Sequence, residues 1–391
     1  MKKIFLSVIL ICIGFMAISQ ERKFDIVNRS FIFPLQELHV HGSSIVELPN
    51  GDFLASWFEG TGERTADDVK IMGAKYNTKT KTWGKAYVMA DTEGLPDCNP
   101  VLFLNKGKLF LIWIAVQANR WEQSVLKLKT STDFQKNEIV WSWQDNVLLK
   151  PNEDFVKEVK KKFTELPQNK QGWAEFAPKY DHMIIEASED LVKRSWGWMT
   201  RIKPLVLSSG RILLPIYSDG LNFSMMAISD NDGKTWTNSL PLVGRGNIQP
   251  TLIQKANGEI MAYMRDTGDD PSLLQESTSK DQGMTWTANK EINLPSTASV
   301  EVVKVDNFNW LLVVNDLEQG RSRLSMYQSK DEGKSWQNIG PIVEDKSREG
   351  RFSYPAFILA SDGMVHLTYS HHKKDNNKTI EHVIINPKSI K

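Results

Sequence analysis

The 391-residue sequence predicts an all-β fold made of repeated sheets, and two internal repeats support this prediction. The first is an eight-residue motif, which occurs as SDNDGKTW at 229–236, SKDQGMTW at 279–286 and SKDEGKSW at 329–336. The copies begin 50 residues apart, and a fixed period of this size is typical of repeat architectures. The second repeat is a hairpin pattern that occurs six times along the chain.

Each copy of the hairpin pattern is an apolar run, a turn marked by Gly or Asn, and a second apolar run. This pattern predicts two antiparallel strands joined by a tight turn. The six copies lie at 45–58, 101–114, 204–217, 251–264, 302–314 and 356–369. Six hairpins therefore predict six sheets of similar size.

The eight-residue motif predicts a turn that is anchored at both ends. Its Ser and Asp can accept hydrogen bonds from turn amides, its Gly suits a positive φ, and its Trp returns the chain to an apolar layer. The motif resembles the Asp-box, or bacterial neuraminidase repeat, of the sialidase superfamily. The resemblance implies a six-bladed β-propeller, in which these turns lie on the face away from the active site.

Weaker copies of the Asp-box follow the first two hairpins, at 77–83 and 131–141, and the last hairpin has none. The chain instead ends in a stretch at 381–385, which we expect to pair with a strand from 23–33. Such pairing places both chain ends in one blade and protects strand edges that would otherwise be exposed.

The repeat period breaks once, between the turn glycines Gly107 and Gly210, and the excess lies at about 144–199. An Asn-Glu-Asp start at 152–154 followed by apolar residues at helical spacing predicts a capped amphipathic helix between blades 2 and 3. An aromatic and charged stretch with Trp173, Tyr180, His182, Arg194, Trp196 and Trp198 follows it. We expect this insert to cover one face of the ring, either as part of a pocket or as a structural cover.

Residues 1–19 read as a basic start, an apolar run and a small-x-small exit, which predicts a cleaved signal peptide. Residues 20–391 are then expected to form one propeller without an integral membrane segment, in a secreted or periplasmic bacterial protein. Only Cys98 remains after cleavage, so no intrachain disulfide is expected. The formal net charge of +1 gives no indication of a nucleic-acid partner.

The resemblance also implies a set of site residues. In the sialidases a Tyr activated by a Glu attacks the anomeric carbon, an Asp is acid and base, and three arginines bind the substrate carboxylate. Tyr354, in FSYP before the last hairpin, falls at the nucleophile position, and Arg265 and Arg321 fall at the second and third arginine positions. A guanidinium suits a planar carboxylate because it donates two parallel hydrogen bonds. The alternatives are a core Tyr and two surface charges.

The acid/base role is assigned to the glycine-rich, charged loop at 60–68 of the first blade. Loops of this kind are where a rigid scaffold carries reactive groups. Asp67 and Asp68 are both candidates, with Asp67 slightly favoured. Arg64 of the same loop would favour their ionisation or bind substrate.

Two positions depart from the family pattern. His41 stands ten residues before the turn glycine Gly51, where sialidases have their first arginine. Gln249 stands nine residues before the turn glycine Gly258, where they have the Glu that activates the Tyr. Gln249 cannot accept the phenol proton and is expected to bind substrate instead. Arg64, Arg201 or Arg351 would have to supply the third arginine.

Three functions are consistent with these residues. The first is a secreted exo-glycosidase of sialidase type that releases a terminal acidic sugar, with sialic acid favoured. The second is a lyase or hydrolase of uronate-containing glycans, in which His41 is the base and Tyr354 the acid. The third is a carbohydrate-binding propeller without catalysis. We expect a glycan partner, no cofactor, and no metal, because His39 and His41 lack a third ligand at convincing spacing.

Overall fold

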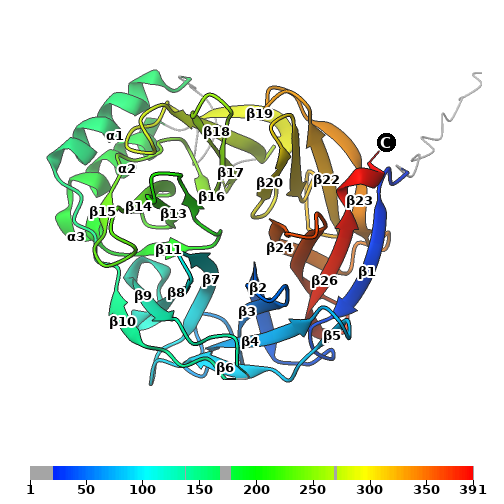
Figure 1. Cartoon of the computed structure of the whole chain (residues 1–391). Helices are drawn as coiled ribbons and strands as arrows, with labels where there is room; N and C mark the ends of the chain where they lie inside the picture. The colour runs from blue at the N-terminus through cyan, green and yellow to red at the C-terminus, as the bar shows by residue number, and fades with distance from the viewer. Residues whose placement is uncertain (1–20, 137, 168–177, 268–270, 391) are drawn as a thin grey trace, which may run out of the picture.

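The computed structural model describes residues 21–136, 138–167, 178–267 and 271–390. Its strands form six antiparallel sheets arranged as blades around a central axis (Figure 1). The fold is therefore the expected six-bladed β-propeller. The signal-peptide prediction and Trp173 lie outside the described residues.

Five blades begin with the predicted hairpin, whereas in blade 3 a short strand at 198–200 precedes it; the first strand of each blade lies nearest the axis. Blade 1 holds β2 (His39–Glu47), β3 (Phe53–Gly60), β4 (Lys70–Asn77), β5 (Thr82–Trp83) and β6 (Tyr87–Ala90). Blade 2 holds β7 (Asp97–Asn105), β8 (Lys108–Val116), β9 (Ser124–Ser131) and β10 (Trp143–Asn146). Blade 3 holds β11 (Trp198–Thr200), β12 (Leu205–Val206), β13 (Ile212–Ser218), β14 (Phe223–Ser229) and β15 (Thr237–Asn238).

The second half of the ring repeats this plan with four strands in each blade. Blade 4 holds β16 (Asn247–Gln254), β17 (Ile260–Asp266), β18 (Leu273–Ser279) and β19 (Lys290–Pro295). Blade 5 holds β20 (Glu301–Asp306), β21 (Asn309–Val314), β22 (Arg323–Ser329) and β23 (Gln337–Glu344). Blade 6 holds β24 (Arg351–Leu359), β25 (Val365–His372), β26 (Lys378–Asn386) and β1 (Asp25–Phe31).

The ring is closed by the two ends of the chain, as predicted. Strand β1 pairs antiparallel with β26, from Asp25 opposite Asn386 to Phe31 opposite Glu381. Figure 1 shows the two strands, blue and red, side by side at the outer edge of blade 6. A buried carboxylate strengthens the closure, because Arg29 Nη1 donates to Glu381 Oε1 at 2.8 Å. Both termini therefore stabilise one blade.

The three Asp-box turns connect the third and fourth strands of blades 3, 4 and 5. In each turn the serine Oγ accepts the glycine amide, at 2.9 Å for Gly233 and Gly283 and 2.8 Å for Gly333. All three glycines have positive φ, as the motif predicted. A Cβ on Gly333 would lie 2.1 Å from the Tyr263 hydroxyl of the preceding blade. The turns therefore also hold neighbouring blades together.

The insert between blades 2 and 3 is helical over more of its length than the sequence predicted. Helix α1 (Glu153–Glu165) is capped by the Asn152 side chain, which accepts the Asp154 amide at 3.0 Å. The aromatic stretch after it forms α2 (Pro178–Glu189) and α3 (Leu191–Ser195). The first and the last residues of the predicted insert at 144–199 belong to strands β10 and β11. Phe155 of α1 packs against Trp198 and Phe223, so the helices lie against blade 3.

The alternation of strand direction separates the two faces of the ring. The Asp-box turns follow the third strands, whereas the inner strands begin at the opposite face. Tyr354, Gln249 and Arg265 lie at the beginning of β24, near the beginning of β16 and near the end of β17, which places them on the face away from the Asp-boxes. In the described part of the chain, no helix combines the length and apolar composition that a membrane span needs.

Candidate active site

The inner strands of four blades each carry a β-bulge with one residue in the left-handed backbone region. These residues are Gly42, Asn99, Gln249 and Tyr354, with φ between 52° and 62°. At each of them the pairing register of the inner strand shifts. Bulges re-aim side chains, and a non-glycine residue in this region costs about 1–3 kcal/mol. The four bulges lie near the beginnings of four inner strands, and this repeated irregularity indicates a functional site.

Gln249 lies between two tyrosines. Its Nε2 donates to Tyr354 Oη at 3.2 Å and to Tyr217 Oη at 3.3 Å. Its Oε1 accepts from Arg265 Nη1 at 3.4 Å, and because arginine only donates, this contact fixes the orientation of the amide. Both phenol oxygens accept from Gln249, so the hydroxyl proton of Tyr354 is left to another acceptor.

The ring of Tyr354 is surrounded by nitrogen-rich side chains. The imidazole of His41 stacks on it, with 4.1 Å between ring centroids. The guanidinium carbons of Arg201 and Arg321 lie 4.8 Å and 5.6 Å from the ring centroid. Cations at this distance interact favourably with the electron-rich face of an aromatic ring. The structure therefore brings together four of the residues that the sequence singled out.

Tyr354, Gln249 and Arg265 line a cavity of about 580 Å³. Its polar side also holds Glu63, Asn99, Tyr217, Asp219 and Asn222. Its apolar side is formed by Trp121 and by Tyr180, Met183 and Ile184 of helix α2. The insert therefore forms one wall of the cavity, which was one of the two interpretations left open by the sequence.

Helix α2 is anchored to blades 3 and 4 by polar contacts. Arg245 forms a bidentate ion pair with Asp181, from Nε at 2.8 Å and from Nη2 at 2.7 Å. Asn222 Nδ2 donates to the Tyr180 hydroxyl at 2.8 Å. A bidentate arginine–carboxylate pair that is largely buried fixes geometry well. The apolar wall is therefore held in a defined position over the site.

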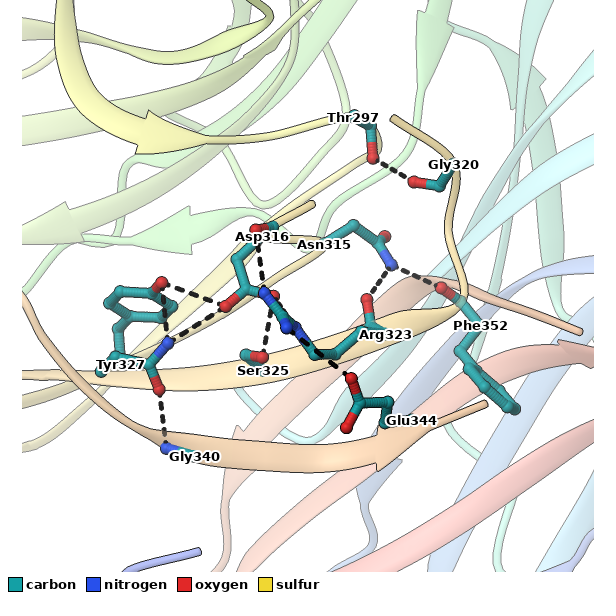
Figure 2. Close-up of polar contacts among 11 residues, drawn as sticks. Thr297, Asn315, Asp316, Gly320, Arg323, Ser325, Tyr327, Gly340, Glu344 and Phe352 are labelled. Atoms are coloured by element: carbon teal, nitrogen blue, oxygen red, sulfur yellow. Dashed lines mark hydrogen bonds and ion pairs between the residues drawn. The ribbon is translucent and has the colours of Figure 1, made fainter. Parts of the chain in front are cut away.

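Arg321 is positioned by main-chain contacts between blades 5 and 6. The Phe352 amide donates to the Arg321 carbonyl at 2.7 Å, two residues before Tyr354. Asn315 Nδ2 donates to the carbonyls of both Arg323 and Phe352 at 2.7 Å, as Figure 2 shows. The segment that carries Arg321 and the strand that carries Tyr354 are therefore fixed to each other.

A second network in Figure 2 holds the strand that follows Arg321. The carboxylate of Asp316 accepts from Arg323 Nε and Ser325 Oγ at 2.8 Å, and from Tyr327 Oη at 3.1 Å. Asn338 adds a fourth donor at 3.1 Å. These four donors satisfy the hydrogen-bonding capacity of the buried carboxylate. The beginning of β22 is therefore rigid.

The arginines form a cationic region beside Tyr354. Burial lowers the pKa of Arg321, and the charges of Arg265 and Arg351 lower it further, whereas Tyr354 and Glu63 raise it. Arg351 is exposed, and Arg64 lies with its guanidinium 5.3 Å from the centroid of the Trp121 ring. Arg201 is buried in contact with main-chain carbonyls. Of the three candidates for a third arginine, Arg64 and Arg351 are therefore the ones that solvent reaches.

The structure places the two predicted aspartates on the outside of their loop. Asp68 is exposed and accepts from the amide and the hydroxyl of Thr61, at 3.1 Å and 2.9 Å. Asp67 is exposed and accepts from Asn119 Nδ2 at 3.3 Å. Neither is among the residues that line the cavity, whereas Glu63 of the same loop is. The loop was expected to supply the acid, and Glu63 is the acidic residue of this loop that lines the cavity.

The environment of Glu63 favours its protonated form. Burial raises the pKa of its carboxyl group, the charge of Asp219 raises it further, and Arg64 and Arg321 oppose this rise. A raised pKa keeps a carboxyl group protonated to higher pH than usual, and the protonated form can donate a proton in catalysis.

Asn99, Tyr217 and Glu63 were missed by sequence reasoning. Asn99 had a signal, because Asn99, Gln249 and Tyr354 each precede a proline and stand eight or nine residues before a turn glycine. Tyr217 and Glu63 had no such signal in the sequence, because strand ends and loops from different blades come together at the axis only in the folded ring. Asn99 Nδ2 donates to Tyr217 Oη at 3.3 Å, which completes the polar floor.

Several solved structures have the same fold. A protein of unknown function from Dyadobacter fermentans aligns with a TM-score of 0.67 at 14% identity, over 93% of this chain and 99% of that chain. The NanB sialidase from Streptococcus pneumoniae aligns with a TM-score of 0.65 at 12% identity, over 94% and 71%. Trypanosoma rangeli sialidase aligns with a TM-score of 0.61 at 14% identity, over 89% and 55%. Identities this low show a common fold and leave the activity open.

The sequence itself matches a family model. The model described as BNR repeat-like domain matches residues 51–200 and 187–367, which together include the three Asp-box turns, Arg265, Arg321 and Tyr354. No curated protein sequence shows a significant match. Because the model covers most of the chain, the chain belongs to the BNR repeat-like domain family, as a divergent member of the sialidase-like superfamily.

Proposed function

We propose that the protein is an exo-acting glycoside hydrolase of sialidase type, which releases a terminal acidic sugar from glycans, with sialic acid the favoured sugar. The observation that carries this proposal is the position of Tyr354, which lines the cavity with Arg265 and has Arg321 over its ring. A cavity of about 580 Å³ lies within the range of about 300–1,000 Å³ that is usual for small ligands.

In this proposal, Arg265 and Arg321 bind the carboxylate of the terminal sugar, and Arg351 or Arg64 supplies a third cation. The Tyr354 oxygen forms a bond to the anomeric carbon as the bond to the leaving oxygen breaks. Glu63 gives its proton to that oxygen and then takes a proton from the water that releases the sugar. The phenol proton leaves through solvent in the cavity, because Gln249 cannot accept it.

The substrate would lie outside the cytoplasm. This part of the proposal rests on the leader-like composition of residues 1–19, which predicts export. An exported glycosidase acts on glycans at a cell surface or in the surrounding medium.

A second candidate reaction is β-elimination from a uronate-containing glycan. Two observations favour it: Gln249 replaces the proton acceptor of a tyrosine nucleophile, and burial keeps His41 neutral by lowering its pKa. For this reaction the neutral imidazole of His41, which is 7% exposed and does not line the cavity, would have to reach the proton next to the uronate carboxylate, and Tyr354 would protonate the leaving oxygen. Arginines would stabilise the negative charge that develops on the carboxylate.

The test is a screen of the purified protein and its Tyr354→Phe variant against a sialoside and a panel of uronate-capped oligosaccharides. Product masses identify hydrolysis by the addition of water, and ultraviolet absorbance detects the carbon–carbon double bond that only a lyase forms. We expect hydrolysis that Tyr354→Phe abolishes. An unsaturated product would establish the lyase reaction, and hydrolysis at the normal rate by Tyr354→Phe would overturn the proposal.

A third outcome of the screen would also overturn the proposal. If the protein binds an acidic sugar without turnover, and substitutions at Tyr354, His41 and Glu63 leave this binding unchanged, the propeller is a carbohydrate-binding module.

A further inference from the structure

Two cationic side chains of blade 3 reach across the central axis of the ring. Arg201 and Lys203 lie where its inner strand is interrupted, between the end of β11 and the beginning of β12. Blade 3 stands opposite blade 6, as Figure 1 shows. Lys203 Nζ donates to the Phe357 carbonyl of β24 at 2.6 Å and forms an ion pair with Glu301 of blade 5. Contacts across the axis are therefore made with the strand that carries Tyr354.

Arg201 makes the contact nearest to the site. Its Nη2 donates to the Pro355 carbonyl of blade 6 at 2.9 Å, and its Nη1 donates to the Ser43 carbonyl of blade 1 at 3.1 Å. Its guanidinium carbon lies 4.8 Å from the centroid of the Tyr354 ring. One side chain thus contacts the ring of Tyr354, the carbonyl after it, and the bulge that follows His41.

Arg201 is not placed to touch a substrate. Its side chain is 2% exposed, and it is not among the residues that line the cavity. Within the described ranges it forms no ion pair, so its charge is compensated by carbonyl groups and by the aromatic ring rather than by a bonded carboxylate. Truncation of this side chain would leave the two buried carbonyl groups without their donor, which costs stability.

Tyr354 needs support from outside its own strand. Its φ of 57° is unfavourable for a residue with a Cβ, and a residue before proline prefers an extended backbone. Local preferences therefore oppose the observed conformation. The carbonyl of Pro355, fixed by Arg201, follows directly after the strained residue.

We propose that Arg201 is a positioning residue that holds the left-handed backbone and the phenol ring of Tyr354 in place. It acts through Tyr354 and makes no contact with the reacting sugar. Its kinetic consequence rests on the proposed function of Tyr354, whereas its effect on the Tyr354 ring does not. Arg201 stands nine residues before its turn glycine, as Gln249 and Tyr354 do before theirs. The position that carries a cavity-lining residue in blades 4 and 6 thus carries the residue that supports Tyr354 in blade 3.

The experiment compares Arg201→Lys and Arg201→Met with Arg194→Met. Arg194 is the control, because it is also buried and donates to main-chain carbonyls, those of Pro151, Ser188 and Glu189, away from Tyr354; unlike Arg201, it also pairs with a carboxylate, that of Glu153. Each protein is labelled with 3-fluorotyrosine, and the ¹⁹F signal of Tyr354 is assigned by its loss in Tyr354→Phe. Melting temperature, kcat and KM are measured on the same preparations.

We expect all three substitutions to lower the melting temperature, and only those at Arg201 to shift or broaden the Tyr354 signal. We expect Arg201→Met to lower kcat about 100-fold, with KM changed less than about threefold, because misplacement of a reacting group by about 1 Å has an effect of this size. Arg201→Lys keeps the charge, and we expect it to lower kcat less than Arg201→Met does.

Two results would overturn the inference. One is an unchanged Tyr354 signal and an unchanged kcat in the folded Arg201 variants. The other is a Tyr354 signal that Arg194→Met perturbs as strongly as Arg201→Met does. If Arg201→Met does not fold, Arg201→Lys decides in the same way. If the wild type turns over no substrate, the proposed function fails and the ¹⁹F comparison alone decides the role of Arg201.

Discussion

The imidazole of His41 stacks on the phenol of Tyr354, with 4.1 Å between the ring centroids and 22° between the ring planes. His41 Nδ1 lies 2.7 Å from Ser370 Oγ, which fixes the ring from blade 6. Burial lowers the pKa of His41, and the charges of His372, His39, Arg321 and Arg201 lower it further. A neutral ring therefore stacks on Tyr354 at the position where the resemblance to sialidases predicted their first arginine.

His41→Phe keeps an aromatic ring against Tyr354 and removes both ring nitrogens. If His41 only supports Tyr354, kcat for release of the acidic sugar should fall less than tenfold, whereas loss of a general base lowers rates by about 10²–10⁴-fold. We expect the smaller effect. Initial rates on the substrate found by the screen provide the measurement, and a loss of about 100-fold would instead favour the lyase reaction.

Gln249→Glu places a proton acceptor 3.2 Å from the Tyr354 hydroxyl, where Gln249 now donates. Under the hydrolase proposal kcat should rise, because the phenol proton gains a direct acceptor during attack. The rise should vanish at acidic pH as the new carboxylate becomes protonated. Gln249→Asn is the control, since it keeps an amide but shortens its reach. A fall in kcat with Gln249→Glu across the whole pH range would contradict a nucleophilic Tyr354.

Glu63→Gln should remove the general acid and lower kcat by about 10²–10⁴-fold on a natural glycan. On an aryl glycoside, whose leaving group needs no proton, the first step should be nearly unaffected. Because the pKa of Glu63 is raised, the wild-type rate should fall as pH rises through that raised value, and this limb should disappear in the variant. Asp67→Asn is the matched control and should change kcat by less than about threefold.

A buried histidine pair makes blade 6 sensitive to acid. His366 Nδ1 lies 3.0 Å from His382 Nε2, and Phe53 of blade 1 stacks on His366 at 3.8 Å. Burial lowers the pKa of His366 from 6.5 to about 4. The folded state therefore binds fewer protons than the unfolded state between these values, so the free energy of unfolding decreases as pH falls below 6.5.

The decrease should reach about 3 kcal/mol for His366 alone near pH 4. Urea unfolding at pH 7 and pH 4 measures it, and the double variant His366→Gln, His382→Gln should show a smaller difference between the two pH values. Equal differences in the variant and the wild type would assign the acid sensitivity to other groups. His39 and His372, whose pKa values are also lowered to about 4, are the next candidates.

Gly333→Ala should destabilise the ring at the contact between blades 4 and 5. The new Cβ would lie 2.1 Å from Tyr263 Oη, and φ is 83°. Gly363→Ala is the matched control, with φ of 79° and no atom within 4 Å of the new Cβ. We expect about 1–2 kcal/mol of destabilisation for the control and about 1–3 kcal/mol more for Gly333→Ala. Equal melting temperatures would show that the Asp-box turn does not couple the blades.

The repeat content of the sequence was sufficient for the architecture. Six hairpins, each with a Gly or Asn turn, predicted six blades, and the composition of 381–385 predicted the closure with β1. These features are local, since a hairpin or a capped turn is formed by neighbouring residues. Counting from the turns also located Gln249 beside Tyr354, because the inner strands start at the same height in each blade.

Contacts between distant segments could not be predicted in this way. The loop at 60–68 was expected to present Asp67 or Asp68, yet Glu63 lines the cavity, because the direction of each side chain depends on how the loop folds over Asn119 and Trp121. The insert was expected to be either part of a pocket or a structural cover, and the Arg245–Asp181 pair holds its helix α2 as a wall of the cavity.

The sequence by itself determined the blade count, the closure of the ring and the register of Tyr354, Gln249 and Arg265, since all of these follow from periodic local patterns. Only the tertiary structure decided that Arg201 reaches across the axis to the carbonyl after Tyr354, and that Glu63 faces the cavity. The physical reason is that these contacts join segments far apart in the chain, so they exist only once the six blades have closed around one axis.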